Sequence, residues 1–269
     1  MTGILAQIIT ITSFGNEYLK NGNLTNFFPQ NSTFQHCDFV DFREMRKKNI
    51  FSSKKEFIVS KNPIEWFEYL KSKNCKKLRL FYQTVKEDDH KMAGFVGGGG
   101  NWFIETISKN QSDLWISRWN HDKNLTEKPW QVTYGKAYEN RPIINQQLDL
   151  AKTKSDLKNI LEKITEFAFK ETTENWGNIF EKAKNTLHSE NPESEFYHKD
   201  LICWNNYDLE NRQLLMSASK AFVFGGMGSW NDMWFEKEET NEVYNKLSSE
   251  LYDLMMKSII SAVNSDKTQ

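Results

Sequence analysis

Two glycine-rich segments, Gly97–Gly100 and Gly225–Asp232, carry the residue types that most plainly suggest a binding site. Glycine lets the backbone approach a ligand closely, while a flat ring, an amide and a carboxylate supply the contacts that a small-molecule site uses. The residues in or beside these segments that we predict to bind a ligand are Gly98, Gly99, Trp102, Gly226, Gly228, Trp230, Asn231 and Asp232.

Each segment also has a purely structural explanation. No Lys-Ser/Thr pair follows Gly97–Gly100 and predicted strands flank it, so it differs from a phosphate-binding loop and suits a bulge or a wide turn. In the second segment, Gly225 or Gly226 can end a preceding helix, and Ser229 can cap the turn that follows. The order Gly-Met-Gly-Ser-Trp does not match the Gly-x-Ser-x-Gly of a serine-hydrolase elbow.

The three cysteines and five histidines form no recognisable metal-binding motif. Cys37, Cys75 and Cys203 are far apart and odd in number, which argues against a zinc ribbon and a disulfide framework and suits a reducing compartment. His36 and Asp38 would share one face of a strand, but they would need a third ligand from elsewhere to hold a metal. The sequence therefore predicts neither a metal nor a cofactor.

The tryptophans of the first half suggest a recognition surface. Trp115 and Trp119 are four residues apart on a predicted strand, so they would lie on the same face of the sheet. Large residues alternate on both faces of this strand, and such a sheet needs cover on both sides. We expect helices to cover one face and predict that Trp115 and Trp119 bind a partner on the other. The alternative is that loops and the N-terminal segment bury them.

The first half of the chain is typical of a sheet. β-branched and alternating residues predict strands, and the hairpin-like separation of the later strands favours an antiparallel arrangement. Between the strands expected over 57–59 and 78–82, Asn62 suits a helix N-cap, with Pro63 in the first turn and Glu65 completing a capping box. The expected strands are 4–12, 34–42, 57–59, 78–82, 92–96 with its continuation through the glycines to 102–107, 114–119 and 130–138.

After Pro142 the pattern changes to amphipathic helix. The expected helices begin with a Thr153/Asp156 capping box and continue through 176–187, 209–224 and 241–263. Strands first and helices second predict an α+β fold, with a mainly antiparallel sheet (about residues 1–140) packed against helices (about residues 145–265). We expect one domain over residues 1–269, with a subdomain boundary near residue 142 as the alternative.

Charge and hydropathy narrow the class of partner. The formal net charge is −1, which provides no overall field to attract nucleic acid or an anionic membrane. The segment from Asp41 to Arg79 is basic, however, with twelve basic and five acidic residues. No stretch is apolar for long enough to span a bilayer, and no basic residue precedes the apolar N-terminal run as in a secretory signal. We therefore expect a cytoplasmic protein without a nucleic-acid or membrane partner, of undetermined oligomeric state.

Two functions fit these observations. The first is a non-catalytic binding protein that recognises a protein or a small ligand through the aromatic sheet face and the glycine-rich turns. The alternative is an enzyme, of hydrolase or transferase type, whose site is assembled from Gly97–Gly100, Gly225–Asp232 and a nearby histidine such as His198 or His36. The enzyme hypothesis requires that the two glycine-rich segments meet in space. The binding hypothesis requires an accessible aromatic surface.

Overall fold

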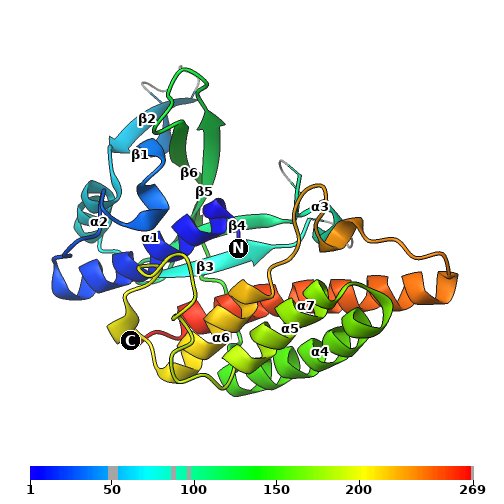
Figure 1. Cartoon of the computed structure of the whole chain (residues 1–269). Helices are drawn as coiled ribbons and strands as arrows, with labels where there is room; N and C mark the ends of the chain where they lie inside the picture. The colour runs from blue at the N-terminus through cyan, green and yellow to red at the C-terminus, as the bar shows by residue number, and fades with distance from the viewer. Residues whose placement is uncertain (48–53, 86–88, 96–97, 268–269) are drawn as a thin grey trace.

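The computed structural model describes residues 1–47, 54–85, 89–95 and 98–267. Its described part places a six-stranded sheet in the N-terminal half and a group of helices in the C-terminal half, the α+β fold that the sequence predicts (Figure 1). The strands are β1 (Cys37–Lys47), β2 (Lys54–Ser60), β3 (Lys77–Gln83), β4 (Asn101–Ile107), β5 (Ser112–His121) and β6 (Trp130–Arg141).

The sheet is mainly antiparallel, as expected, with one parallel pair. Its strand order is β2-β1-β6-β5-β4-β3, so β2 and β3 form the edges. β1 and β6 run parallel, whereas the other neighbouring strands are antiparallel. The parallel pair arises because the chain crosses over the sheet between β2 and β3 and returns through the β3–β6 meander.

The helices account for the rest of the core. They are α1 (Gly3–Asn21), α2 (Pro63–Ser72), α3 (Asp89–Met92), α4 (Leu150–Glu171), α5 (Glu174–Thr186), α6 (Leu209–Lys220) and α7 (Glu238–Asn264), with short 3₁₀ turns η1 (Ser32–Phe34), η2 (Trp204–Asn206) and η3 (Trp230–Asp232). Among the described helices, none combines the length and the apolar character needed to cross a membrane. Buried apolar side chains of both halves form one cluster, and the number of domains stays a prediction.

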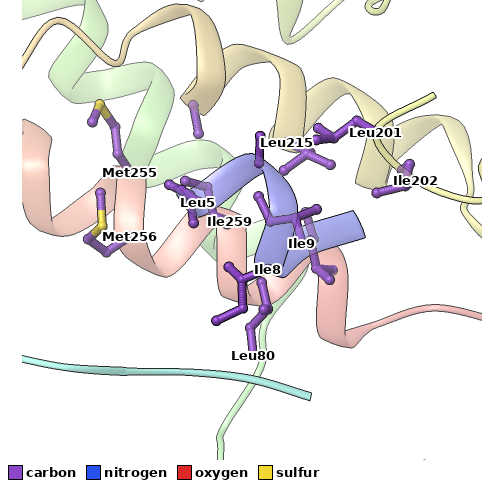
Figure 2. Close-up of a cluster of buried hydrophobic side chains, with 14 of the residues drawn as sticks. Leu5, Ile8, Ile9, Leu80, Leu201, Ile202, Leu215, Met255, Met256 and Ile259 are labelled. Atoms are coloured by element: carbon purple, nitrogen blue, oxygen red, sulfur yellow. The ribbon is translucent and has the colours of Figure 1, made fainter. Parts of the chain in front are cut away.

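The strand predicted over 4–12 is wrong: these residues belong to helix α1. Its β-branched run resembles a strand because the helix is buried on nearly all sides and therefore has no polar face to reveal its period. Figure 2 shows Leu5, Ile8 and Ile9 among apolar side chains of β3, α6 and α7. Burial on every side overrides the strand preference of isoleucine and threonine.

The polar residues of α1 are buried with their hydrogen bonds made. The Gln7 amide donates to the Thr33 carbonyl (3.1 Å) and accepts from the Tyr134 hydroxyl (3.0 Å). The Thr10 hydroxyl donates to the Leu201 carbonyl (2.8 Å). Since a buried polar group without a partner costs about 1–3 kcal/mol, these bonds let α1 occupy the centre of the molecule.

The other helix boundaries follow the predictions unevenly. α2 begins as expected, with Asn62 accepting from the Glu65 backbone N–H (2.9 Å). α4 begins one turn earlier than the predicted Thr153/Asp156 box, because Asp149 caps it by accepting from the Lys152 N–H (2.9 Å). The strand predicted over 92–96 is wrong, since its described residues comprise the end of α3 and the turn after it.

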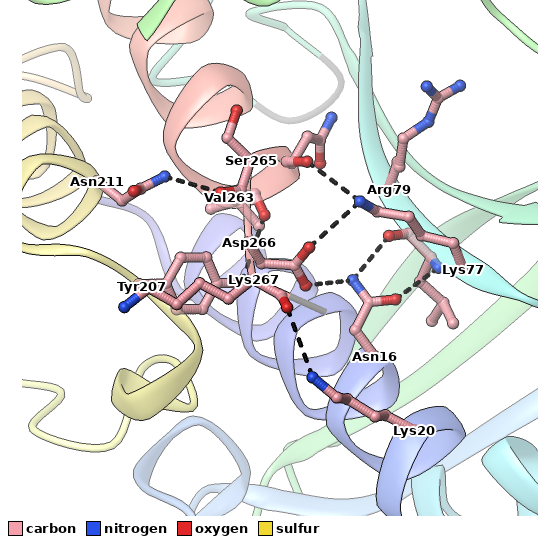
Figure 3. Close-up of polar contacts among 12 residues, drawn as sticks. Asn16, Lys20, Lys77, Arg79, Tyr207, Asn211, Val263, Ser265, Asp266 and Lys267 are labelled. Atoms are coloured by element: carbon pink, nitrogen blue, oxygen red, sulfur yellow. Dashed lines mark hydrogen bonds and ion pairs between the residues drawn. The ribbon is translucent and has the colours of Figure 1, made fainter. Parts of the chain in front are cut away.

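Side-chain amides of α1 and α7 complete the edge of the sheet at β3, which these two helices cover. The Leu78 N–H donates to the Asn16 amide oxygen (2.7 Å), and the Asn16 amide donates back to the Leu78 carbonyl (3.0 Å). Asn264 repeats this pattern at Leu80, with distances of 2.8 and 2.9 Å. Each amide therefore replaces one peptide unit of an absent neighbouring strand. In Figure 3, Asn16 also meets Asp266, which forms an ion pair with Lys77 (3.2 Å).

Candidate functional site

A cavity of about 380 Å³ lies between the N-terminal turn of α1, the turn that contains Gly98, Gly99 and Gly100, β5 and α7. We call this turn the first glycine turn. We call the cavity the aromatic cavity, because its lining includes the rings of Phe95, Trp102, Trp119, Trp130, Phe222 and Tyr252. Four residues that the sequence analysis selected converge here, namely Gly98, Gly99, Trp102 and Trp119. Its volume lies in the lower part of the range of about 300–1,000 Å³ typical of ligand pockets.

The first glycine turn forms one wall of the aromatic cavity. Gly99 and Gly100 have φ angles of 76° and 79°, which residues with a side chain rarely adopt. A Cβ on Gly99 would lie 2.8 Å from the Ala93 Cα. The Gly99 carbonyl accepts from two tyrosine hydroxyls, Tyr82 (2.9 Å) and Tyr252 (2.6 Å). The turn thus needs glycine for its conformation and its close packing. Gly97 lies outside the described residues.

Aromatic pairs stiffen the walls of the cavity. The ring centroids of Trp119 and Trp130 lie 5.8 Å apart in an edge-to-face arrangement, and those of Tyr82 and Trp102 lie 4.9 Å apart. Such pairs contribute about 0.5–1.5 kcal/mol beyond the area that they bury. At the mouth, Ile4 is 43% and Phe95 is 58% exposed, so apolar surface extends from the cavity to solvent.

The prediction that Trp115 binds a partner is not compatible with its position. Its side chain is fully buried, and the indole N–H donates to the Thr106 hydroxyl (3.3 Å). Its ring packs edge-to-face on Trp66 of α2, with centroids 5.2 Å apart. The physical reason is that α1 and α2 cover the sheet face that Trp115 shares with Trp119. Only Trp119, nearer the end of β5, reaches a cavity.

Within the second glycine-rich segment, Trp230 is a core residue and does not face a ligand site. It is fully buried, its indole N–H donates to the Ser248 hydroxyl (2.8 Å), and its ring lies edge-to-face on Phe180 (4.9 Å between centroids). Gly226 and Gly228 are exposed in the turn before it. The Asp232 carboxylate accepts from the Gly228 N–H, which closes that turn locally.

The two glycine-rich segments are neighbours, but their described residues line different cavities. The Asn231 amide donates to the Lys91 carbonyl (3.2 Å), and a Cβ on Gly94 would collide with the Gly225 carbonyl. These contacts join the second segment to the residues before the first glycine turn. Asn231 lines a polar cavity of about 310 Å³ together with His90, separate from the aromatic cavity of Gly98 and Gly99.

A serine, a histidine and an aspartate that are distant in the sequence meet near the 3₁₀ turn η1. The Ser32 hydroxyl lies 2.7 Å from His198 Nδ1 and donates to the Asp200 carboxylate, which also accepts from the Ser32 N–H (2.7 Å). In a hydrolase triad the histidine stands between serine and carboxylate and removes the serine proton. Here Ser32 lies between the other two side chains, and its hydroxyl donates a hydrogen bond to Asp200. The cluster therefore joins the η1 turn to the loop that contains His198 and Asp200.

The pKa of His198 predicts acid sensitivity of this cluster. Burial lowers the pKa of His198 below its ordinary value of 6.5, against the opposing effect of Asp200. The unfolded chain therefore takes up the proton first as the pH falls, so stability is lost below about pH 6.5. We expect the urea midpoint of the wild type to fall more between pH 7.5 and 5.5 than that of His198→Gln. The exposed His188→Gln serves as the control, and equal falls in all three proteins would refute this assignment.

A largely buried ion network lines another cavity, of about 320 Å³, beside α2. Lys136 bridges Glu44 (2.7 Å) and Asp113 (2.8 Å), and the Tyr69 hydroxyl donates to Glu44 (2.6 Å). Burial opposes the charge of Lys136, but its bonds to Asp113 and Glu44 outweigh burial and raise its pKa. Lys136 is thus held protonated, and its two ion pairs join β6 to β1 and β5.

The cysteines are poorly suited to nucleophilic chemistry. Burial raises the pKa of Cys203 to about 11 and that of Cys75 to about 12, so little thiolate is present at neutral pH. Among the residues that the structure describes, no three His, Cys, Asp or Glu side chains gather as a metal ion would require. The aromatic cavity is therefore the arrangement in the described chain with the clearest binding chemistry.

These features define an α+β protein with an aromatic cavity at the junction of its sheet and its helices. No protein-family model, no curated protein and no solved structure matches the chain. Its function is therefore argued from the cavity alone.

Proposed function

We propose that this chain is a non-catalytic binding protein that takes a small ligand in the aromatic cavity. The observation that carries the proposal is the convergence of Gly98, Gly99, Trp102 and Trp119 on one cavity of about 380 Å³. These residues come from the glycine turn, β4 and β5. A binding role for each was expected from residue type alone, and their convergence supports a common one.

The concave shape of the cavity favours a small molecule over a protein partner. Apolar area removed from water contributes about 25 cal/mol per Å². A ligand ring between Trp102, Trp119 and Trp130 is covered on several sides, whereas a protein side chain on the open sheet would be covered on one. The burial of Trp115 supports the same choice, because it removes half of the partner surface expected from the sequence.

The catalytic alternative has less support. The described residues of its two glycine-rich segments line separate cavities. The Ser32 hydroxyl donates its hydrogen bond to the Asp200 carboxylate and not to His198.

A cytoplasmic location remains part of the proposal for the binding protein. It is supported by three cysteines that are all free, as a reducing compartment would keep them.

The test is a fluorescence titration with the neutral apolar probe N-phenyl-1-naphthylamine. We expect saturable binding to the wild type and a dissociation constant raised about tenfold or more in Trp102→Ala and Trp119→Ala, because each variant removes an aromatic wall. Ser117→Phe is a second variant that fills the cavity without removing a ring, and it should also abolish binding. Trp234→Ala removes a tryptophan that is 73% exposed and lies on the separate polar cavity, so it should bind normally.

Circular dichroism and the urea midpoint establish that each variant is folded before binding is compared. Absence of saturable probe binding by the folded wild type would overturn the proposal. Undiminished binding by folded Ser117→Phe would do the same, because the probe would then occupy another place.

A further inference from the structure

We infer that the ligand of the aromatic cavity is an uncharged molecule with a flat, largely apolar ring system. This inference rests on the proposed function and names the chemical class of the ligand. It follows from the charges around the cavity, from the state of its polar groups and from the orientation of its rings.

The lining of the cavity offers no counter-charge. Among its described residues there is no Asp, Glu, Lys, Arg or His. On β5, Ile116, Ser117 and Trp119 line the cavity, whereas the Arg118 side chain is 58% exposed and pairs with Glu56. A charged ligand group would lose its hydration without gaining an ion pair.

Several polar groups around the glycine turn are already bonded within the protein, and the remaining polar side chains of the lining, Asn101 and Ser117, carry no charge. The hydroxyls of Tyr82 and Tyr252 donate to the Gly99 carbonyl, and the Gly98 N–H donates to the Phe95 carbonyl (3.0 Å). The Thr2 side chain at the start of α1 accepts from the Leu5 N–H (3.3 Å). The positive end of this helix attracts an anion only weakly at an exposed position. This attraction is smaller than the free energy that a carboxylate loses when it leaves water.

The orientation of the rings favours a flat ligand. Two of the rings that line the cavity, those of Trp119 and Trp130, meet at an interplanar angle of 69°. Walls at such an angle offer one ring face for stacking and another ring edge for an edge-to-face contact. An aromatic ring system uses both kinds of contact, whereas a flexible chain would lose conformational freedom to do so.

The experiment compares three ligands that share a naphthalene ring and differ in charge. 2-Acetylnaphthalene is neutral, 2-naphthoate is an anion and 2-naphthylmethylammonium is a cation. Each is titrated against the complex of wild-type protein with N-phenyl-1-naphthylamine at pH 7.5, and displacement of the probe is followed by fluorescence. We expect the neutral compound to displace the probe at a concentration at least about tenfold lower than either ion needs.

The possible outcomes separate this inference from the proposed function. Displacement by 2-naphthoate or by the ammonium compound at the same or a lower concentration than 2-acetylnaphthalene overturns the neutral ligand class and leaves the binding protein standing. Failure of N-phenyl-1-naphthylamine to bind the folded wild type removes both. Trp234→Ala, outside the cavity, should reproduce the wild-type order of the three compounds, and a changed order in this variant would place the compounds elsewhere.

Discussion

Replacing Asn264 with alanine is expected to lower the free energy of unfolding by about 2–4 kcal/mol, and replacing Asn16 and Asn264 together by about 3–6 kcal/mol. Both amides are almost fully buried, and each makes a reciprocal pair of hydrogen bonds with the backbone of β3. Alanine leaves the Leu78 and Leu80 N–H groups buried without these acceptors. The cost exceeds that of an ordinary lost hydrogen bond because water cannot replace the amide.

The urea midpoint at constant m-value measures the loss. The control is Asn120→Ala, since Asn120 is an exposed strand residue whose amide bonds to Gln131, and it should shift stability by no more than about 0.5 kcal/mol. The double variant should also aggregate faster on warming, because an edge strand without its bonded cover can pair with another chain. Wild-type stability of Asn264→Ala would show that the β3 edge does not depend on its amides.

The general architecture was predictable because it depends on local patterns. Strand alternation and helical spacing can be recognised in the sequence where one face is buried and the other is exposed to solvent, as at α2 and α4. α1 broke this rule, since the consecutive residues 5–13 are all buried and therefore cover every side of one helix. A helix without a wet face carries no 3.6-residue signal, and its isoleucines and threonines then indicate a strand.

The candidate site was predictable only in part, for a similar reason. Gly98, Gly99 and Trp102 stand together in the sequence, so residue type alone was enough to select them. Trp115 and Trp230 have the same ring as Trp102, and burial distinguishes them only after the chain has folded. A single sequence also cannot bring Thr2 and Tyr252 to one cavity, or Ser32 within hydrogen-bonding distance of His198, 166 residues away.

A second large effect is expected at the buried ion pair of Arg79 and Glu105, on the sheet face opposite α1. The Arg79 guanidinium bonds to the Glu105 carboxylate (2.7 Å) and to the Ile144 carbonyl (2.6 Å), and the same carboxylate accepts from the Ile144 N–H (3.0 Å). Glu105 has no exposed surface. The pair therefore holds the segment between β6 and α4 against the sheet.

Glu105→Ala should destabilise the fold by about 3–5 kcal/mol, because it leaves a guanidinium largely buried without its counter-charge and the Ile144 N–H without its acceptor. The double variant Arg79→Met/Glu105→Leu removes both charges and keeps the volume, so it should be clearly more stable than Glu105→Ala despite carrying two changes. Urea unfolding of the three proteins measures this order. If the double variant were the less stable one, the attraction between the two charges, and not the penalty of leaving one alone, would be what fixes this segment to the sheet.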